Sequence, residues 1–432
     1  MDNLTYTLTD IEAANARNMD LVEGDIRPLG SCEHLFWLLD QGSPMHFSLA
    51  AQIEGHATVG DWRAALGHVQ RRHPFFSMHI ERNGRANPHF RAAPQTPIPI
   101  RVVRVVSSQP NWLTEMQREL ATPFDPARAP LVRAVLMHEP HRATFILTAH
   151  HSIADGLSLS FAIRDTLLAL SGTPMDPLLV TPPIESMLDS AERGQIENAS
   201  AAEVNEIEGV RPSVFHPRHG SIPSIRGLRL SAELTAKLRK RARQEETTVH
   251  GALCAALVLA GRQVISEWTG NPVRVLSPID IRKLVGMGEH CGLFVSATPV
   301  SFKPDASTDF WELARFAKRQ LAGAQTRDGV VPVIDAIHQS ISQELDAQAA
   351  SQFDGFAREA ILTNLGNLRY GTTFGKFNLE ALWGPAIVGG LEGERTIGVV
   401  TVNGSLHLLH TSHAPVPFLL ERMEQALLTS CG

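Results

Sequence analysis

The heptapeptide HHSIADG at positions 150–156 places two histidines, an aspartate and a glycine within one short segment. Imidazole has an ordinary pKa of about 6.5, so a histidine can accept a proton from a hydroxyl, amine or thiol at neutral pH and return it to a leaving group. An aspartate four residues later can order a loop or pair with a cation more readily than it can attack a substrate. The segment therefore predicts general acid–base chemistry.

The residues before this motif limit which histidine can do that chemistry. They are largely apolar and predict a strand over 144–151, in which successive side chains point to opposite faces. His150 and His151 must then point apart, so one of them can be the reacting base. His150 also fits a buried structural histidine whose ring is held by the backbone.

A turn and an apolar helix are expected directly after the strand. Strand ends in α/β folds are places where side chains reach a cleft. Asp155 fits a helix N-cap as well as an ionic role. Gly156 fits either a turn glycine with positive φ or a backbone N–H donor to an oxyanion.

Other chemistries find less support in the sequence. A metal-dependent hydrolase using His150, His151 and Asp155 is disfavoured because adjacent strand histidines cannot readily chelate one ion. The segment GLSLS after the aspartate is not the G-x-S-x-G elbow of serine hydrolases. Gly286 and Gly288 lack the further glycine and the strand context of a nucleotide-binding loop.

Two α/β halves must position the motif, and no internal repeat is evident. The first half is predicted to contain helices at 61–72 and 112–121 and strands at 76–80, 132–138 and 144–151. The second is predicted to contain helices at 231–245, 250–265, 310–324 and 418–428, and strands at 273–279, 294–300, 360–365, 398–402 and 405–410. Asn403-Gly404 predicts a hairpin turn between the last two strands.

A proline-punctuated segment separates the halves. We therefore expect an N-terminal lobe at 1–175, a connector at 176–226, and a C-terminal lobe at 227–432; the segment 192–208 of the connector fits one helix. The overall fold class is α/β, with a mixed sheet and covering helices in each lobe.

Composition excludes several classes of protein. The chain has 432 residues, of which 43% are hydrophobic and 19% charged, so it has enough apolar surface for folded cores. A net charge of −6 makes nucleic acid a poor partner. Four scattered cysteines, an N-terminus unlike a secretory signal and no apolar run of about 20 residues predict a cytoplasmic protein without a transmembrane segment.

The motif HHSIADG resembles the HHxxxDG signature of the condensation-domain and CoA-dependent acyltransferase superfamily, which includes stand-alone condensation domains and polyketide-associated acyltransferases. Further segments resemble this family in its own order along the chain. They are AALGHVQRRHP (64–74), FDPARAPLVR (124–133), EETTVHGALCAALVLA (245–260), SPIDIR (277–282) followed by GLFVS (292–296), and TNLG (363–366). The plant-type DFGWG element is absent, and Ser296 stands where many relatives have asparagine.

The resemblance implies two chloramphenicol-acetyltransferase-like lobes that form a V around a central tunnel. It implies that His151 is the general base or a positioning residue, and that Asp155 pairs with Arg282 to hold the loop. It also implies that Asn364 and Ser296 bind the substrate. A surface position remains the alternative for Arg282, and a turn position remains the alternative for Asn364.

The resemblance further implies a stand-alone acyltransferase of polyketide, nonribosomal peptide or lipid biosynthesis. Its donor would be the phosphopantetheine thioester of a carrier protein, or CoA, and its acceptor a small alcohol or amine. Ester formation is favoured over amide formation because TNLG (363–366) is closer to polyketide-associated acyltransferases. We expect a monomer with no bound cofactor or metal. A non-catalytic scaffold of the same fold that binds carrier proteins is the alternative.

Overall fold

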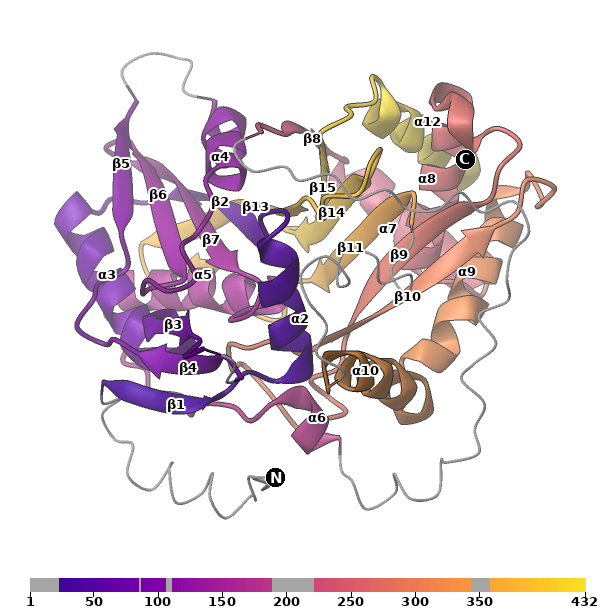
Figure 1. Ribbon diagram of the computed structural model, residues 1–432. Coiled ribbons are helices and arrows are strands. Elements are labelled where there is room, and N and C mark those ends of the chain that lie inside the picture. The colour runs from indigo at the N-terminus through magenta and orange to yellow at the C-terminus, as the bar shows by residue number, and fades with distance from the viewer. Residues whose placement is uncertain (1–22, 85–86, 106–110, 189–220, 343–357) are drawn as a thin grey trace.

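The computed structural model describes residues 23–84, 87–105, 111–188, 221–342 and 358–432. Two six-stranded sheets dominate it, one on each side of the molecule in Figure 1. The N-terminal sheet has the strand order β12-β13-β2-β7-β6-β5, in which only β5 and β6 run parallel. Its strands are β2 (His46–Glu54), β5 (Ile100–Arg104), β6 (Val132–His138), β7 (Arg142–His150), β12 (Thr373–Phe374) and β13 (Phe377–Ile387).

The C-terminal sheet has the order β10-β9-β11-β14-β15-β8. β11 runs parallel to both of its neighbours while the other pairs are antiparallel, so this sheet is mixed as well. Its strands are β8 (Ser224–Arg229), β9 (Val273–Asp280), β10 (Val295–Phe302), β11 (Ala360–Asn367), β14 (Arg395–Val402) and β15 (Ser405–Ser412). A small third sheet contains β1 (Gly24–Pro28), β3 (Met78–Glu81) and β4 (His89–Ala92).

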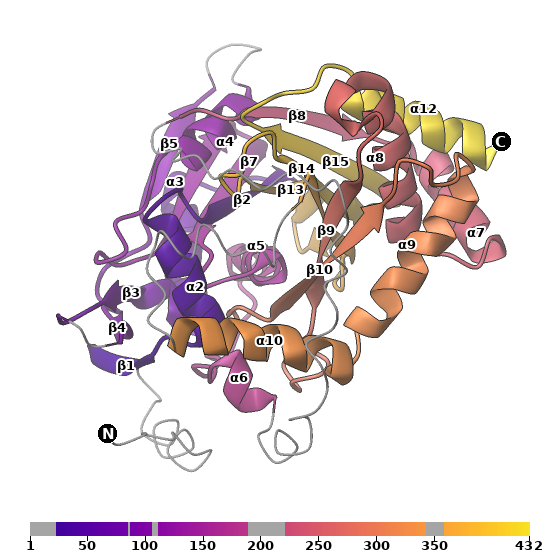
Figure 2. The ribbon, with the colours of Figure 1, turned by 45° about the vertical axis from the view of Figure 1, so that its right-hand side comes forward.

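Helices cover both large sheets, and two of them lie between the lobes. The helices of the N-terminal lobe are α3 (Val59–Arg72), α4 (Trp112–Ala121) and α5 (Gly156–Leu170). Those of the C-terminal lobe are α7 (Ala232–Gln244), α8 (Val249–Val264), α9 (Phe310–Ala324) and α12 (Leu419–Cys431). The helices α2 (Ser31–Asp40) and α10 (Arg327–Ser342) pack together where the lobes meet, beside the short α6 (Ile184–Met187) (Figure 2).

Local sequence signals explain why the helices start where they do. The hydroxyls of Thr58, Ser231 and Thr248 accept hydrogen bonds from the first turns of α3, α7 and α8. Such side chains satisfy backbone N–H groups that have no partner within the helix. Within the described residues, no helix is long and apolar enough to cross a membrane.

Most predicted elements are confirmed with small shifts at their ends. The helix expected at 112–121 is α4, and the hairpin at Asn403-Gly404 joins β14 to β15. The strand expected at 76–80 begins later, because Pro74 opens a 3-10 turn through Ser77 and β3 starts at Met78. The helix considered at 192–208 lies outside the described residues.

The sequence did not reveal that β13 belongs to the N-terminal sheet. It lies between β11 and β14 along the chain, both of which belong to the C-terminal sheet, yet it pairs antiparallel with β2 over almost its whole length. The lobes are thus joined by shared strands as well as by contact (Figure 1).

Candidate active site

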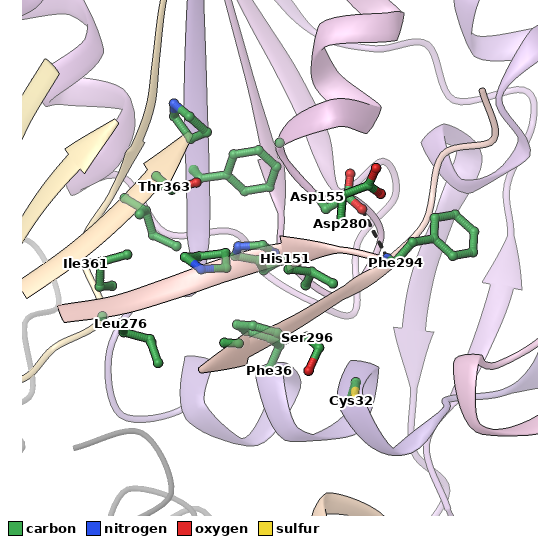
Figure 3. A pocket seen from close by; sticks show the side chains of 18 of the residues that line it. Cys32, Phe36, His151, Asp155, Leu276, Asp280, Phe294, Ser296, Ile361 and Thr363 are labelled. Carbon is green, nitrogen blue, oxygen red and sulfur yellow. Dashed lines mark hydrogen bonds between the residues drawn. The ribbon is translucent and has the colours of Figure 1, made fainter. Parts of the chain in front are cut away.

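A cavity of about 260 Å³ lies between the lobes. The N-terminal lobe contributes α2, the start of β2 and the turn between β7 and α5, whereas the C-terminal lobe contributes β9, β10, β11 and α10. His151 lies centrally among the labelled side chains of Figure 3. The cavity therefore brings the motif to residues more than a hundred positions later in the chain.

The ring of His151 is held in a defined position and tautomer. It stacks on Phe36 at a centroid distance of 4.4 Å and lies 4.6 Å from the ring of Phe47. Its Nδ1 lies 3.0 Å from the carbonyl oxygen of Ala154. Because a carbonyl only accepts, Nδ1 must carry the proton, which leaves the lone pair of a neutral ring on Nε2.

Burial sets the charge of His151. Removal from water lowers the pKa of its imidazole to about 4, although the nearby carboxylate of Asp155 opposes this shift. The ring is therefore neutral at neutral pH. Nε2 is available there as a proton acceptor.

His150 points away from the cavity, and its ring is fully buried. The N–H of Ser152 donates to its Nδ1 at 3.1 Å, so a neutral ring carries its proton on Nε2. That Nε2 lies 3.4 Å from Oδ1 of Asp40. The two histidines therefore occupy opposite sides of the strand end, as alternation predicts.

Asp155 pairs with Arg282 across the two lobes. Nη1 and Nη2 of Arg282 donate to the two carboxylate oxygens at 2.7 and 2.9 Å. Arg282 is 1% exposed, so it does not lie at the surface. Asp155 also caps α5 by accepting from the N–H of Ser158 at 2.9 Å, and it accepts from the N–H of Phe294 at 3.0 Å (Figure 3).

The carboxylate of Asp155 stays ionised inside the protein. Burial acts to raise its pKa, but the charge of Arg282 and the hydrogen bonds from Arg282, Ser158 and Phe294 together hold the pKa below its ordinary value. The N-cap role and the ionic role considered for this residue are both present. One carboxylate thereby fixes the start of α5 against β9 and β10.

Gly156 is the first residue of α5 and lines the cavity. A Cβ atom there would lie 2.8 Å from Cδ2 of Leu365 and 3.0 Å from Cγ of Pro385, so any larger residue would force these side chains to shift. The N–H of a first helical residue has no acceptor within its own helix.

Ser296 and Asn364 line the C-terminal side of the cavity. Ser296 is 5% exposed on β10. Oδ1 of Asn364 accepts from the N–H of Gly366 at 2.8 Å, where β11 bulges. Asn364 thus has the turn contact that was its alternative, at a position that also faces the cavity.

Several cavity residues carried no signal in the sequence. Those from α2 and α10 belong to helices that were not predicted, and their apolar side chains resemble ordinary core residues. They include Cys32, Leu35, Phe36, Leu39, Val333, Ile334 and Ile337. Among the described residues, no three histidine, cysteine, aspartate or glutamate side chains gather as a metal site would require.

Two family models match successive parts of the chain. Residues 37–198 match the model described as "Condensation domain". Residues 219–372 match the model described as "Phthiocerol/phthiodiolone dimycocerosyl transferase C-terminus". The chain belongs to the condensation-domain superfamily, together with the polyketide-associated acyltransferases.

Curated relatives are large synthetases. The chain is 24% identical over 326 residues to "Phosphinothricin tripeptide synthetase PhsC" of Streptomyces viridochromogenes, a match that covers 69% of this chain and 30% of the relative. It is 23% identical over 313 residues to "Tyrocidine synthase 3" of Brevibacillus parabrevis, covering 69% of this chain and 5% of the relative. The chain therefore spans less than a third of these two relatives.

Solved structures share the two-lobe fold over nearly the whole chain. "Structure of polyketide synthase associated protein 5 from Mycobacterium tuberculosis" matches with a TM-score of 0.63 at 18% identity, covering 95% of this chain and 99% of that one. The first condensation domain of the CDA synthetase matches with a TM-score of 0.69 at 16% identity, covering 95% of each chain. The predicted chloramphenicol-acetyltransferase-like α/β fold is thus confirmed.

Proposed function

We propose that this protein transfers an acyl group from a thioester to a hydroxyl or amine acceptor in natural-product biosynthesis, with His151 as the base. The observation that carries this proposal is the neutral ring of His151, whose Nε2 is unprotonated and whose position lies in a cavity shared by both lobes. Membership of the condensation-domain superfamily supports the same reaction class.

In the proposed reaction, Nε2 of His151 takes the proton of the acceptor hydroxyl or amine as its oxygen or nitrogen attacks the thioester carbonyl carbon. A tetrahedral oxyanion forms. The carbon–sulfur bond then breaks, and the imidazolium returns its proton to the departing thiolate. The reaction needs no covalent acyl-enzyme, so no nucleophilic side chain is required beside His151.

The residues around His151 have supporting roles in this proposal. The N–H of Gly156, at the start of α5, would donate to the oxyanion, where a preorganised donor is most effective. The pair Asp155–Arg282 would hold that turn in place. Ser296 and Asn364 would contact the substrate from the opposite lobe.

The donor would be the phosphopantetheine thioester of a carrier protein, or CoA, which makes a carrier protein the expected partner. Ester formation is favoured because the model that matches 219–372 derives from a transferase of the polyketide-associated type. Within the same proposal, residues 1–175 and 227–432 form the two lobes and 176–226 connects them, with β13 crossing back to the first lobe.

His151→Ala tests the function directly. The purified variant and wild type would be offered acyl-carrier and acyl-CoA donors with hydroxyl and amine acceptors, and products would be followed by mass spectrometry. We expect loss of about 10²–10⁴-fold in rate, the usual contribution of a positioned base. His68→Ala, at an exposed position on α3, is the matched control.

Unchanged transfer by His151→Ala would exclude the general-base role. No transfer by wild type with any donor would favour the non-catalytic scaffold that binds carrier proteins.

A further inference from the structure

We infer that the substrate portion seated beside His151 is an uncharged apolar chain or ring, and not an aminoacyl group with a free α-ammonium. This inference rests on the proposed function and adds the substrate class to it. The same chemistry could belong to the acyl donor or to the acceptor, and the experiment below separates these two sources.

The charged side chains around the cavity are matched with one another. Its two carboxylates are Asp155, which is engaged by Arg282, and Asp280, which lies 3.2 Å from Nη1 of Arg282 and 2.6 Å from Nη2 of Arg369. The third lining arginine, Arg358, donates to Glu394 at 2.8 Å. In the described part of the chain, therefore, each carboxylate that lines the cavity is already paired with an arginine, and none is left over to bind an ammonium group.

An ammonium group in this cavity would lack a counter-charge. It would lose its hydration among apolar side chains, and burial of an unpaired charge is strongly unfavourable. The nearest titratable group, His151, is neutral and must itself accept a proton. A charged α-amine beside it would also disfavour the imidazolium that forms during transfer.

Apolar side chains from four elements line part of the cavity. α2 supplies Leu35, α10 supplies Ile337, and the C-terminal sheet supplies Leu276 from β9 and Ile361 from β11. All four are at most 6% exposed. Leu276 and Ile361 lie next to each other to the left of His151 in Figure 3, so an apolar group beside the base would bury surface against both.

Leu276 and Ile361 are consequently the expected specificity-determining residues. Their strands, β9 and β11, are paired through Ile361 and Leu276 themselves, so the two side chains are held in fixed register. A larger side chain at either position would shorten the space available to an apolar chain. The contacts that hold the ring of His151 come from Ala154, Phe36 and Phe47, so neither substitution removes them.

The experiment compares wild type with Leu276→Trp and Ile361→Trp, with Leu428→Trp on the exposed face of α12 as the matched control. One arm varies the donor among acetyl, octanoyl and palmitoyl pantetheine thioesters and the α-amino counterpart of the octanoyl donor. The other arm varies the acceptor in the same way, among ethanol, 1-octanol and 2-amino-1-octanol, which is its α-amino counterpart. Binding by calorimetry and product formation are both measured.

In one of the two arms, we expect wild type to prefer the octanoyl or octyl compound over its α-amino counterpart by at least about tenfold, a typical discrimination for a desolvated site. Leu276→Trp and Ile361→Trp should shift preference toward the acetyl or ethyl compound by a similar factor, whereas Leu428→Trp should not. The arm in which the chain-length preference shifts identifies whether the donor or the acceptor packs against Leu276 and Ile361.

Equal or tighter binding of the α-amino compounds in both arms would overturn the inference, as would unchanged chain-length preference in both tryptophan variants. Preferential binding of apolar compounds without any product would support the inference and contradict the acyl-transfer function. The two proposals therefore fail separately.

Discussion

Removal of one partner of the ion pair between Asp155 and Arg282 should be among the most destabilising single substitutions in this protein. We propose to remove the cation with Arg282→Met, which retains an unbranched apolar stem of similar length. The variant leaves Asp155, 5% exposed, as a buried carboxylate that retains its backbone donors but has lost its counter-charge.

The magnitude follows from the geometry. Both oxygens of Asp155 bind Arg282, at 2.7 and 2.9 Å, and Arg282 also donates to Ser158 and Asp280 at 2.9 and 3.2 Å. Breaking a buried pair by removing one partner costs about 3–5 kcal/mol, whereas an exposed pair contributes about 0–1 kcal/mol. Lys237→Met, which removes the exposed i,i+4 pair with Glu233, is therefore the control, with an expected loss of about 0.5 kcal/mol.

Urea unfolding followed by tryptophan fluorescence measures the difference, and the effect should depend on pH. In wild type the pKa of Asp155 lies below its ordinary value of 3.8, so its stabilising contribution is complete above that value and is lost as pH falls through the lowered pKa. In Arg282→Met burial instead raises this pKa. The difference in free energy of unfolding between wild type and Arg282→Met should therefore become smaller as pH falls from 7 toward about 4.

A second substitution checks the mechanism. Asp155→Asn added to Arg282→Met removes the unpaired charge but keeps an N-cap acceptor, so it should restore part of the lost stability. A loss of less than about 1 kcal/mol in Arg282→Met, or a double variant no more stable than the single one, would refute the reasoning.

Three further predictions concern the same region. The rate of acyl transfer should stay nearly constant above about pH 5 and fall toward pH 4 as His151 becomes protonated, and an acid limb near pH 6.5 would indicate a solvated ring instead. Gly156→Ala should lower the free energy of unfolding by about 1–3 kcal/mol, because the added methyl group overpacks against Leu365. An unchanged midpoint of urea unfolding would contradict this. Asp40→Leu removes the carboxylate oxygen that accepts from the Met45 N–H at 2.7 Å, so the free energy of unfolding should fall by about 1–3 kcal/mol. An unchanged free energy of unfolding would show that water replaces this acceptor.

Elements with strong local patterns were predictable from the sequence. α3 has Trp62, Leu66 and Val69 at helical spacing, and the hairpin at Asn403-Gly404 has the backbone conformation with positive φ that such turns need. The strand before the motif also predicted that the two histidines diverge. In each case a few adjacent residues determine the outcome.

The apolar wall of the cavity could not be predicted in this way. Leu35 on α2 and Ile337 on α10 lie about three hundred positions apart, and each belongs to a stripe that would also fit an ordinary core. Which stripe faces a cavity depends on how the helices pack, and that is a property of the whole fold. Arg282 was assigned through family resemblance, since its own segment does not identify its partner.

The path of β13 shows why the two lobes have to be understood as one unit at the active site. β13 pairs with β2 in the first sheet, while the backbone at Pro385 lies so close to β14 that a Cβ at Gly398 would be only 2.1 Å from its carbonyl oxygen. Pro385 also bounds the space beside Gly156. Opening the lobes at this point would separate β13 from β2 or from β14, so the turn that carries His151 is held against the second sheet by shared backbone as well as by the ion pair.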